Sequence, residues 1–424
     1  MRAIALPAFA VALVACGSSD PGPAGPRDAG AAGSADAGAR LTWFDDVAPI
    51  AYSECSGCHR EGGIAPFSMF DTAAVVASAP LMKQHTATRT MPPMPANNDG
   101  SCQTYSNARW LTQAQIDTIG TWVDQGRVLG DPSHEPARPP APAGLTGSTI
   151  TLDIGTSYMP HAQASSPDDD YHCFVVDPGM ASMQYMTGYQ VMPGDARVVH
   201  HLIVYAVPDA AAEAQVDAND AAEAGPGYTC FGGPGLTRTT PIALWAPGGG
   251  ATVFPTDTGI ALEPGHRVVV QIHYNLLGGS FPDRTSVLVQ LAPTVARPAG
   301  FIPILDLGIR LPPGMPHVEH SATIMSPRLG SGTIWGWAPH MHTLGTTMRV
   351  ELASGGECVG DVDRWDFHWQ SLWWYSTPIA VTPALLSGGV RITCGYDTTS
   401  RSDTVTWGES TTDEMCIAYF YVSA

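Results

Sequence analysis

The chain has 424 residues and carries 20 Lys and Arg against 39 Asp and Glu, so its formal net charge is −19 at pH 7. Such acidity predicts no nucleic-acid partner, because binding phosphates needs a basic surface. The 45 Gly and 37 Pro favour turn-rich β structure over long helices. The length suggests two or three domains, and no internal apolar run reaches the ~18 residues of a membrane-spanning helix.

Residues 1–15 combine a positively charged start with a short apolar stretch, which is the pattern of a signal peptide. The stretch runs into Leu13-Val14-Ala15-Cys16-Gly17, which resembles a bacterial lipobox, where the Cys becomes lipidated. Residues 16–40 are mostly Gly, Ala, Ser, Pro and Asp and predict a flexible tether. We therefore expect an exported protein, anchored to a membrane of the bacterial cell envelope through Cys16, facing the periplasm or the outer-membrane surface. An ordinary signal peptide with a chance Cys is the alternative.

The motif Cys55-Ser56-Gly57-Cys58-His59 is the c-type haem attachment pattern C-x-x-C-H. Its two thiols can form thioethers to the haem, and His59 can bind the iron. The surrounding sequence resembles small cytochromes c, in which a Met in a loop before the last helix is the second iron ligand. Met91 is our candidate, Met94 is a competitor, and both could instead be packing residues.

A capping box formed by Thr112 and Gln115 predicts the start of that last helix, and Gly126 predicts its end. Residues 41–131 are therefore expected to form a small all-α cytochrome c-like domain with one covalently bound haem c. The Pro-rich residues 132–148 predict a stiff linker.

Residues 149–424 consist of short β-rich runs separated by Gly and Pro, without sustained helical periodicity, which predicts a mainly β fold of two sandwiches. The expected strands are 171–177, 197–206, 267–274, 333–338, 346–352, 390–394 and 415–422. Five aromatic residues of this region are expected to belong to its core: Trp365, Trp369, Trp373, Trp374 and Tyr375.

Histidines occur in three clusters on these strands. His340 and His342 are two residues apart, so they point to the same face of a strand and can reach one metal. His200 and His201 would face opposite ways on a flat strand, and sharing a metal, with His273 for example, requires a twist or a bulge. A thioether ligand near such imidazoles would indicate copper.

Four segments in this order resemble the copper type II, ascorbate-dependent monooxygenases: Val199-His200-His201-Leu202, Gln271-Ile272-His273-Tyr274, His340-Met341-His342 and Glu414-Met415-Cys416. The resemblance implies two jelly-roll-like β-sandwich domains, 149–295 and 296–424, that face each other across a solvent-filled cleft. Each domain would hold one copper ion, with His200, His201 and His273 at an electron-transfer site and His340, His342 and Met415 at a dioxygen site.

The resemblance also implies two disulfides, Cys173–Cys230 and Cys394–Cys416, and leaves Cys102 and Cys358 without an assignment. Two further family residues are retained in this chain: Tyr419, which the resemblance places in the substrate pocket, and Gln271, which it places near the electron-transfer copper. Two family residues that hold a peptide carboxylate are replaced by Ala338 and Ile417. Because apolar side chains cannot hold a carboxylate, we expect no peptide substrate of this kind.

We therefore expect a copper monooxygenase that hydroxylates a C–H bond of a small molecule with O2 and two electrons. The electrons are expected from an external donor, such as ascorbate or a cytochrome, and in part from the fused haem, through the all-histidine copper. Two alternatives are a non-catalytic copper and haem electron-transfer lipoprotein, and a zinc hydrolase built on His340 and His342.

Overall fold

The structure of the protein is a computed structural model that describes residues 40–424, except for a few short gaps. These gaps are residues 64, 164–167, 232, 237–238, 247–249, 327–328, 409, 411 and 424. The predicted signal peptide and Cys16 lie outside the described residues, as does nearly all of the predicted tether. Among the described residues, no helix is long and apolar enough to cross a membrane.

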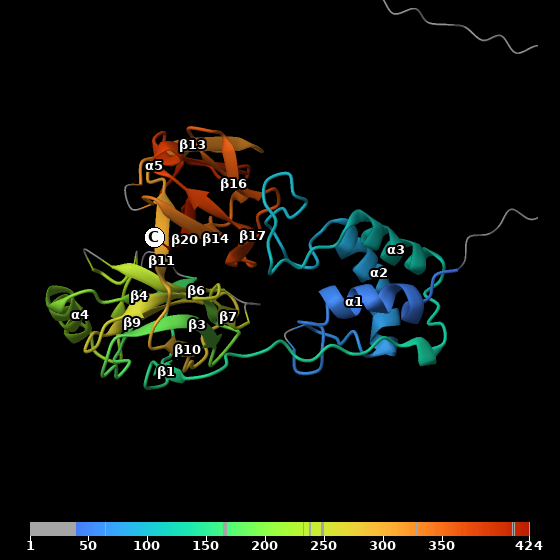
Figure 1. The fold of residues 1–424 in the computed structure, drawn as a ribbon, viewed down its shortest axis with the longest axis horizontal. Coiled ribbons are helices and arrows are strands. Elements are labelled where there is room, and N and C mark those ends of the chain that lie inside the picture. Colours follow the sequence, from blue (N-terminus) through green and yellow to red (C-terminus); the bar gives the residue numbers. More distant parts are fainter. Residues whose placement is uncertain are drawn as a thin grey trace, which may run out of the picture. The chain divides into compact units, whose positions relative to one another are not determined.

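The part of the chain that carries the C-x-x-C-H motif is helical (Figure 1). Its elements are a π-helical turn η1 (Trp43–Val47), α1 (Ala48–Glu54), α2 (Thr72–Ala87) and α3 (Gln113–Asp124). The predicted capping box is present at the start of α3, and Gly126 follows its end with a φ of 98°. The helices enclose a separate core centred on Trp43 and Trp122, whose rings lie 5.5 Å apart.

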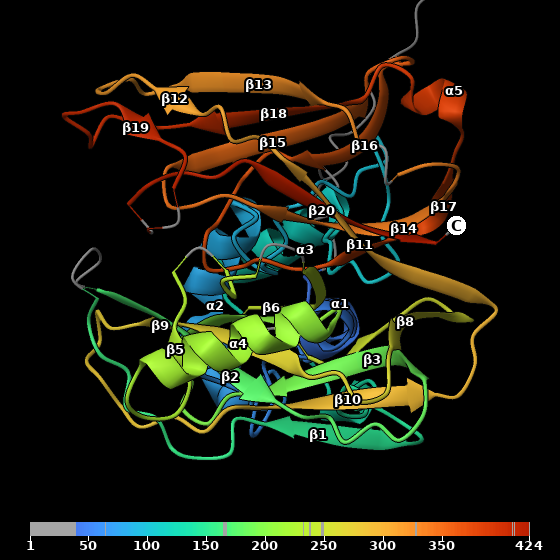
Figure 2. The same ribbon diagram turned by 90° about the vertical axis from the view of Figure 1, so that its left-hand side faces the viewer.

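Residues 149–424 form two pairs of facing sheets (Figure 2). One sheet of the first pair contains β5 (Tyr228–Thr229), β2 (Asp169–Val176), β9 (Val268–Asn275), β4 (Val199–Ala206) and β6 (Thr240–Trp245) in this order. Its partner contains β1 (Thr149–Asp153), β10 (Ser286–Ala292), β3 (Gln184–Met192) and β8 (Thr258–Leu262), and β7 (Thr252–Val253) pairs with β3. Apolar side chains from both sheets fill one core.

The second pair has the same plan. One sheet contains β11 (Arg297–Leu305), β20 (Ile417–Ser423), β14 (Gly332–His340) and β17 (Trp373–Val381). The other contains β13 (Val318–Ile324), β18 (Val390–Tyr396), β15 (Gly345–Leu352) and β16 (Glu357–Val362). A small ribbon of β12 (Arg310–Leu311) and β19 (Val405–Thr406) accompanies them. The mainly β architecture of sandwiched sheets agrees with the sequence prediction.

Strand β11 connects the two sandwiches. It pairs with β20 in antiparallel fashion along seven residue pairs, and its first two residues pair in parallel with β8. One nine-stranded sheet therefore runs through both sandwiches. The predicted domain boundary after residue 295 falls in the loop before β11, and it stays a prediction because the sheet is continuous there.

All seven predicted strands are present within two residues of their expected ends. The sequence analysis did not identify two helices of this region, α4 (Ala210–Ala222) and the short α5 (Pro383–Leu386). The carboxylate of Asp209 caps α4 by accepting a hydrogen bond from the amide of Ala212 at 2.9 Å. The alanine-rich run lacks an amphipathic pattern and forms a helix by intrinsic propensity and capping.

All six cysteines beyond the haem motif and Cys16 form disulfides. Cys173–Cys230 and Cys394–Cys416 pair as the family resemblance implied. Cys102 and Cys358, which had no predicted partner, form the third bridge across a sequence separation of 256 residues. This bridge joins the loop before α3 to β16 of the second sandwich.

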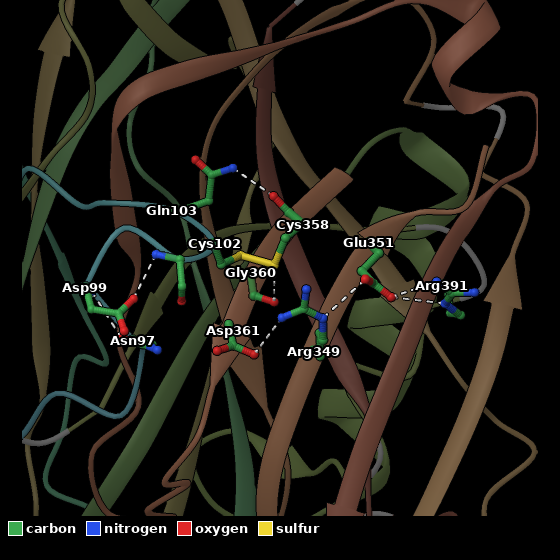
Figure 3. A network of polar contacts seen from close by, with 11 residues as sticks. Asn97, Asp99, Cys102, Gln103, Arg349, Glu351, Cys358, Gly360, Asp361 and Arg391 are labelled. Atoms are coloured by element: carbon green, nitrogen blue, oxygen red, sulfur yellow. Dashed lines mark hydrogen bonds and ion pairs between the residues drawn. A yellow bond between two sulfur atoms is a disulfide. The ribbon is translucent and has the colours of Figure 1, made fainter. Parts of the chain in front are cut away.

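The loop around Cys102 is packed into the second sandwich (Figure 3). Met94, Ala96 and Tyr105 are buried in the core of that sandwich. Next to the disulfide, the side chain of Gln103 donates to the carbonyl of Cys358 at 2.7 Å, and the amide of Asn97 donates to the carbonyl of Asp361 at 2.9 Å. The helical part of the chain is thus held to the second sandwich by a core contact and a disulfide, while the Pro-rich segment connects it to β1 of the first sandwich.

Candidate copper sites and haem cavity

A bulge in β4 places two adjacent histidines on the same side of the strand. Val199 lies opposite Tyr274 of β9, and His201 lies opposite His273, so β4 contains one extra residue between the two pairs. That extra residue is His200. The bulge provides the local irregularity that the sequence analysis required for His200 and His201 to share a metal.

Three imidazole δ-nitrogens converge at this bulge. His201 Nδ1 lies 3.3 Å from His200 Nδ1 and 3.1 Å from His273 Nδ1. Nitrogens bound at about 2.0 Å in a tetrahedral site are about 3.3 Å apart, so this spacing suits a shared metal ion. Burial and the neighbouring imidazoles lower the pKa of His200 to about 3 and hold the pKa of His201 well below its ordinary value, which keeps both rings in the neutral form that binds metals.

The orientation of His273 is fixed by two neighbours that the sequence analysis did not identify. Its Nε2–H donates to the carboxylate of Asp169 at 2.8 Å, so Nδ1 is left to face the other two histidines. The ring of Tyr171 stacks on it at 4.1 Å with an interplanar angle of 7°. Side chains alternate along β2, so Asp169 and Tyr171 lie on the same face of the strand. This spacing was the only feature of the sequence that could have indicated their common contact with His273.

The second histidine pair uses the opposite ring nitrogens. His340 ends β14, His342 follows two residues later, and their ring centroids lie 5.3 Å apart. His340 Nδ1–H donates to Oε1 of Gln370 at 2.6 Å, and His342 Nδ1–H donates to the carbonyl of Asp413 at 3.1 Å. These partners leave both Nε2 atoms available to a metal. Burial lowers the pKa of His342 to about 3 and also lowers that of His340.

Met415 lines the same cavity as His340 and His342. It is only 5% exposed and lies two residues before β20, yet it does not belong to the described hydrophobic core clusters, whereas the adjacent Cys416 does. Two imidazoles and one thioether therefore face one space. This donor set suits copper, in particular its reduced form.

Glu414 joins the two segments that carry these donors, a role that the sequence analysis missed. Its carboxylate accepts hydrogen bonds from the amide of His342 at 3.0 Å and from that of Leu344 at 2.6 Å. Burial raises the pKa of Glu414 to about 7 despite these bonds. The residue stood inside the Glu-Met-Cys motif, but its side-chain partners are 70 and 72 positions away.

The two histidine clusters are neighbours, contrary to the expectation that a solvent-filled cleft separates them. The ring centroids of His201 and His340 lie 6.1 Å apart. A loop of the second sandwich, residues 365–372, brings Phe367 onto His200, with ring centroids 4.7 Å apart and an angle of 28°. The same Phe367 ring lies 6.2 Å from His342. Aromatic packing thus occupies part of the space assigned to solvent.

A cavity of about 320 Å³ opens beside the two clusters. Its wall includes Gln271 and Tyr419, both predicted at the site, together with Ala338 and Ile417. Gln271 is held by its Nε2, which donates to the carbonyl of Cys230 at 2.9 Å. Among the described residues that line the cavity there is no Lys, Arg, Asp or Glu. The cavity therefore offers aromatic and aliphatic surface, amide and hydroxyl groups, and the histidines.

A second cavity of about 320 Å³ contains the predicted haem residues. Cys55, Cys58, His59 and Met91 all line it, among apolar neighbours. His59 Nδ1–H donates to the carbonyl of Phe67 at 3.2 Å, which leaves Nε2 free for an iron. Neither Cys55 nor Cys58 forms a disulfide. These residues fit a covalently bound haem with a histidine and a methionine ligand.

The structure separates the two methionine candidates for the iron. Met91 lines the cavity with the C-x-x-C-H residues, whereas Met94 is 3% exposed in the core of the second sandwich.

The five aromatic residues that were expected to belong to the core of the β region do not all lie there. Trp373 and Tyr375 belong to that core, but Trp369 lines the cavity of the haem motif, so its assignment to the core was wrong.

Comparison with known proteins agrees with the histidine and methionine geometry. Residues 156–278 match the N-terminal domain, and residues 317–422 the C-terminal domain, of the copper type II ascorbate-dependent monooxygenases. These segments cover more than half of the chain, which belongs to this family.

Two relatives illustrate the range of similarity. The chain is 25% identical over 329 residues to tyramine beta-hydroxylase of Caenorhabditis briggsae, a match that covers 70% of this chain and 52% of the relative. It is 28% identical over 255 residues to DBH-like monooxygenase protein 1 of Mus musculus, covering 53% of this chain and 39% of the relative. The chain thus spans about half or less of their length. A solved structure of peptide-N-glycosidase F covers 65% of this chain and 96% of its own, but a TM-score of 0.29 at 9% identity says nothing about function.

Replacing Asp169 by Asn tests the three-nitrogen site. The change keeps the shape of the side chain but weakens the bond that orients His273, so we expect the affinity for copper at this site to fall by about 10–100-fold. Competition with a copper chelator measures it. Asp168→Asn, at the exposed neighbouring position, is the matched control, and equal affinities in both variants would contradict the assigned role of Asp169.

Proposed function

We propose that the chain is a copper-dependent monooxygenase that uses O2 and two electrons to hydroxylate a C–H bond of a small molecule. The observation that carries the proposal is the placement of two different donor sets beside one cavity. His200, His201 and His273 present three δ-nitrogens, and His340, His342 and Met415 present two ε-nitrogens and a thioether. Family membership supports the same reaction class.

The residues at each site support different tasks. The three-histidine set would hold the electron-transfer copper, and the set with Met415 would hold the copper at which O2 is reduced. Copper, when bound, supplies the change between cuprous and cupric states that O2 reduction requires. The protein contributes fixed imidazoles through Asp169, Gln370 and Glu414, and the cavity beside them positions the substrate.

The substrate we propose is uncharged. A relative carries the name tyramine beta-hydroxylase, but the described lining of the cavity has no carboxylate to balance an ammonium group. It also has no Arg or Lys for a carboxylate, and Ala338 and Ile417 stand where the peptide-hydroxylating relatives would bind one. Tyr419 and Gln271 remain as polar groups that can orient a neutral substrate.

We further propose that residues 41–131 carry one haem c and supply part of the electrons. Cys55 and Cys58 would form the thioethers, and His59 and Met91 would bind the iron. The mostly apolar lining of this cavity suits a haem, and methionine ligation favours a raised potential suited to electron transfer. An external donor, such as ascorbate or another cytochrome, must then reduce the haem.

The proposed location is the cell envelope, through an anchor at Cys16. Three disulfides in the described residues support an oxidising compartment.

Exchanging Met415 for Leu tests the monooxygenase proposal. The volume is nearly conserved while the sulfur is lost, so we expect O2-dependent hydroxylation to fall by at least two orders of magnitude with copper at the three-histidine site retained. Product analysis and metal quantification measure the two effects. Met348→Leu makes the same exchange in the core and should leave both unchanged. Full activity of Met415→Leu, or zinc in place of copper, would contradict the proposal.

Exchanging each loop methionine for Leu identifies the iron ligand. We expect Met91→Leu to remove the far-red absorption of a methionine–ferric iron bond and to lower the haem reduction potential. Met94→Leu should leave the haem spectrum unchanged, because its side chain lies in a protein core. The reverse result would assign the iron to Met94.

Matched compounds test the substrate class. With excess reductant, we expect 4-ethylphenol to stimulate O2 uptake and product formation more than tyramine or 3-(4-hydroxyphenyl)propanoate. The ammonium group of tyramine and the carboxylate of the propanoate would have to lose their water shell in the cavity without an opposite charge to bind. Cyclohexylmethanol and cyclohexylmethylamine extend the comparison to aliphatic compounds. Preference for the amine in both sets would show that a charge partner exists at the site.

A further inference from the structure

We propose that residues 365–372, within the loop between β16 and β17, are the electron-transfer connection between the haem cavity and the copper ligands. Trp369 is its contact on the haem side, and Gln370 is its contact on the copper side. This inference rests on the proposed function, since it needs both haem and copper. It adds a route and an entry point that neither the motifs nor the family resemblance assign.

On the copper side, the loop touches both histidine clusters. Oε1 of Gln370 accepts a hydrogen bond from His340 Nδ1 at 2.6 Å. Phe367 stacks on His200, and the indole N–H of Trp365 donates to the carbonyl of His342 at 3.0 Å. Three side chains of one eight-residue loop therefore contact three of the predicted copper ligands.

On the haem side, Trp369 lines the cavity that contains Cys55, Cys58, His59 and Met91. It is the next residue to Gln370. From the indole to the imidazole of His340, the route consists of covalent bonds and one short hydrogen bond. Electronic coupling decays more slowly through bonds than across van der Waals gaps, so this route is favoured over a jump through open space.

The loop is held in place by the segment that carries the methionine loop. Nδ2 of Asn107 donates to the carbonyl of Leu372 at 2.8 Å, and Oδ1 of Asn107 accepts from the amide of Trp374 at 2.9 Å. Two residues further, Arg109 donates to the sulfur of Cys58 at 3.4 Å. The Cys102–Cys358 disulfide fixes the same segment to β16, just before the loop (Figure 3). Hydrogen bonds and a disulfide of this one segment thus connect the haem cavity with the loop.

The hydrogen bond between Gln370 and His340 places the proposed entry point at His340. The sequence analysis expected haem electrons to reach the three-histidine site first. Gln370 instead bonds to His340, and the ring of His201 lies 6.1 Å from His340, close enough for electrons to redistribute between the two sites. In each step one ferrous haem becomes ferric and one cupric ion becomes cuprous, and an external one-electron donor then restores the ferrous haem. Two such steps supply one hydroxylation.

Internal electron transfer in the full, haem- and copper-loaded chain tests the route. Under anaerobic conditions, a pulse of a photogenerated one-electron reductant reduces the haem, and its reoxidation is followed by absorbance while the cupric signal is followed by electron paramagnetic resonance. We expect Trp369→Leu to slow haem reoxidation by an order of magnitude, with haem and copper contents unchanged. Trp374→Leu, a matched change at a tryptophan that lines neither the haem nor the copper cavity, should retain the wild-type rate.

The copper side is tested separately. Gln370→Leu removes the acceptor for His340 and should slow the same step, whereas Gln370→Glu keeps an acceptor and should be closer to wild type. A wild-type rate in Trp369→Leu overturns the route, and a wild-type rate in Gln370→Leu overturns the entry at His340. A chain that binds no haem or no copper would overturn the proposed function itself, which metal and haem quantification shows before any rate is measured.

Discussion

The bulge at His200 is the constraint on which the copper site depends. On a regular strand, His200 and His201 would lie on opposite faces, and only one could meet His273 of the neighbouring strand. One extra residue in β4 brings all three δ-nitrogens together. Three imidazole nitrogens at such distances suit a shared cation, which would accept a lone pair from each of them. The strand irregularity therefore produces the arrangement of imidazoles that we propose holds a copper ion.

The two histidine clusters differ in the ring nitrogen that they leave free, and the neighbouring hydrogen bonds decide this difference. Asp169 binds the ε-nitrogen of His273, whereas Gln370 and the carbonyl of Asp413 bind the δ-nitrogens of His340 and His342. The histidines of one proposed site would thus approach a metal through the nitrogen nearer the backbone, and those of the other through the more distant nitrogen. The chain can in this way build two unlike sites from the same side chain.

The helical part of the chain is not attached by a linker alone. Met94, Ala96 and Tyr105 belong to the core of the second sandwich, and the Cys102–Cys358 bridge ties the same segment to β16. Burial of this segment fixes the position of Met91, only three residues before Met94, next to the C-x-x-C-H motif. Packing and redox chemistry are therefore linked in one loop, because the residues that anchor it and the candidate iron ligand are close in the chain.

The sequence by itself determined the strands, the capped helix α3, the order of the histidine motifs and the family, because these depend on local periodicity and on residue spacing. It missed α4, since an alanine-rich helix has little hydrophobic pattern. Only the tertiary structure decided the Cys102–Cys358 pairing, the different roles of Met91 and Met94, and the contacts of Asp169, Glu414 and Trp369. It also brought the two histidine clusters within 6.1 Å, where the sequence resemblance implied a solvent-filled gap. Each of these depends on residues far apart in the chain, whose approach is set by the packing of whole sheets and loops and not by any local pattern.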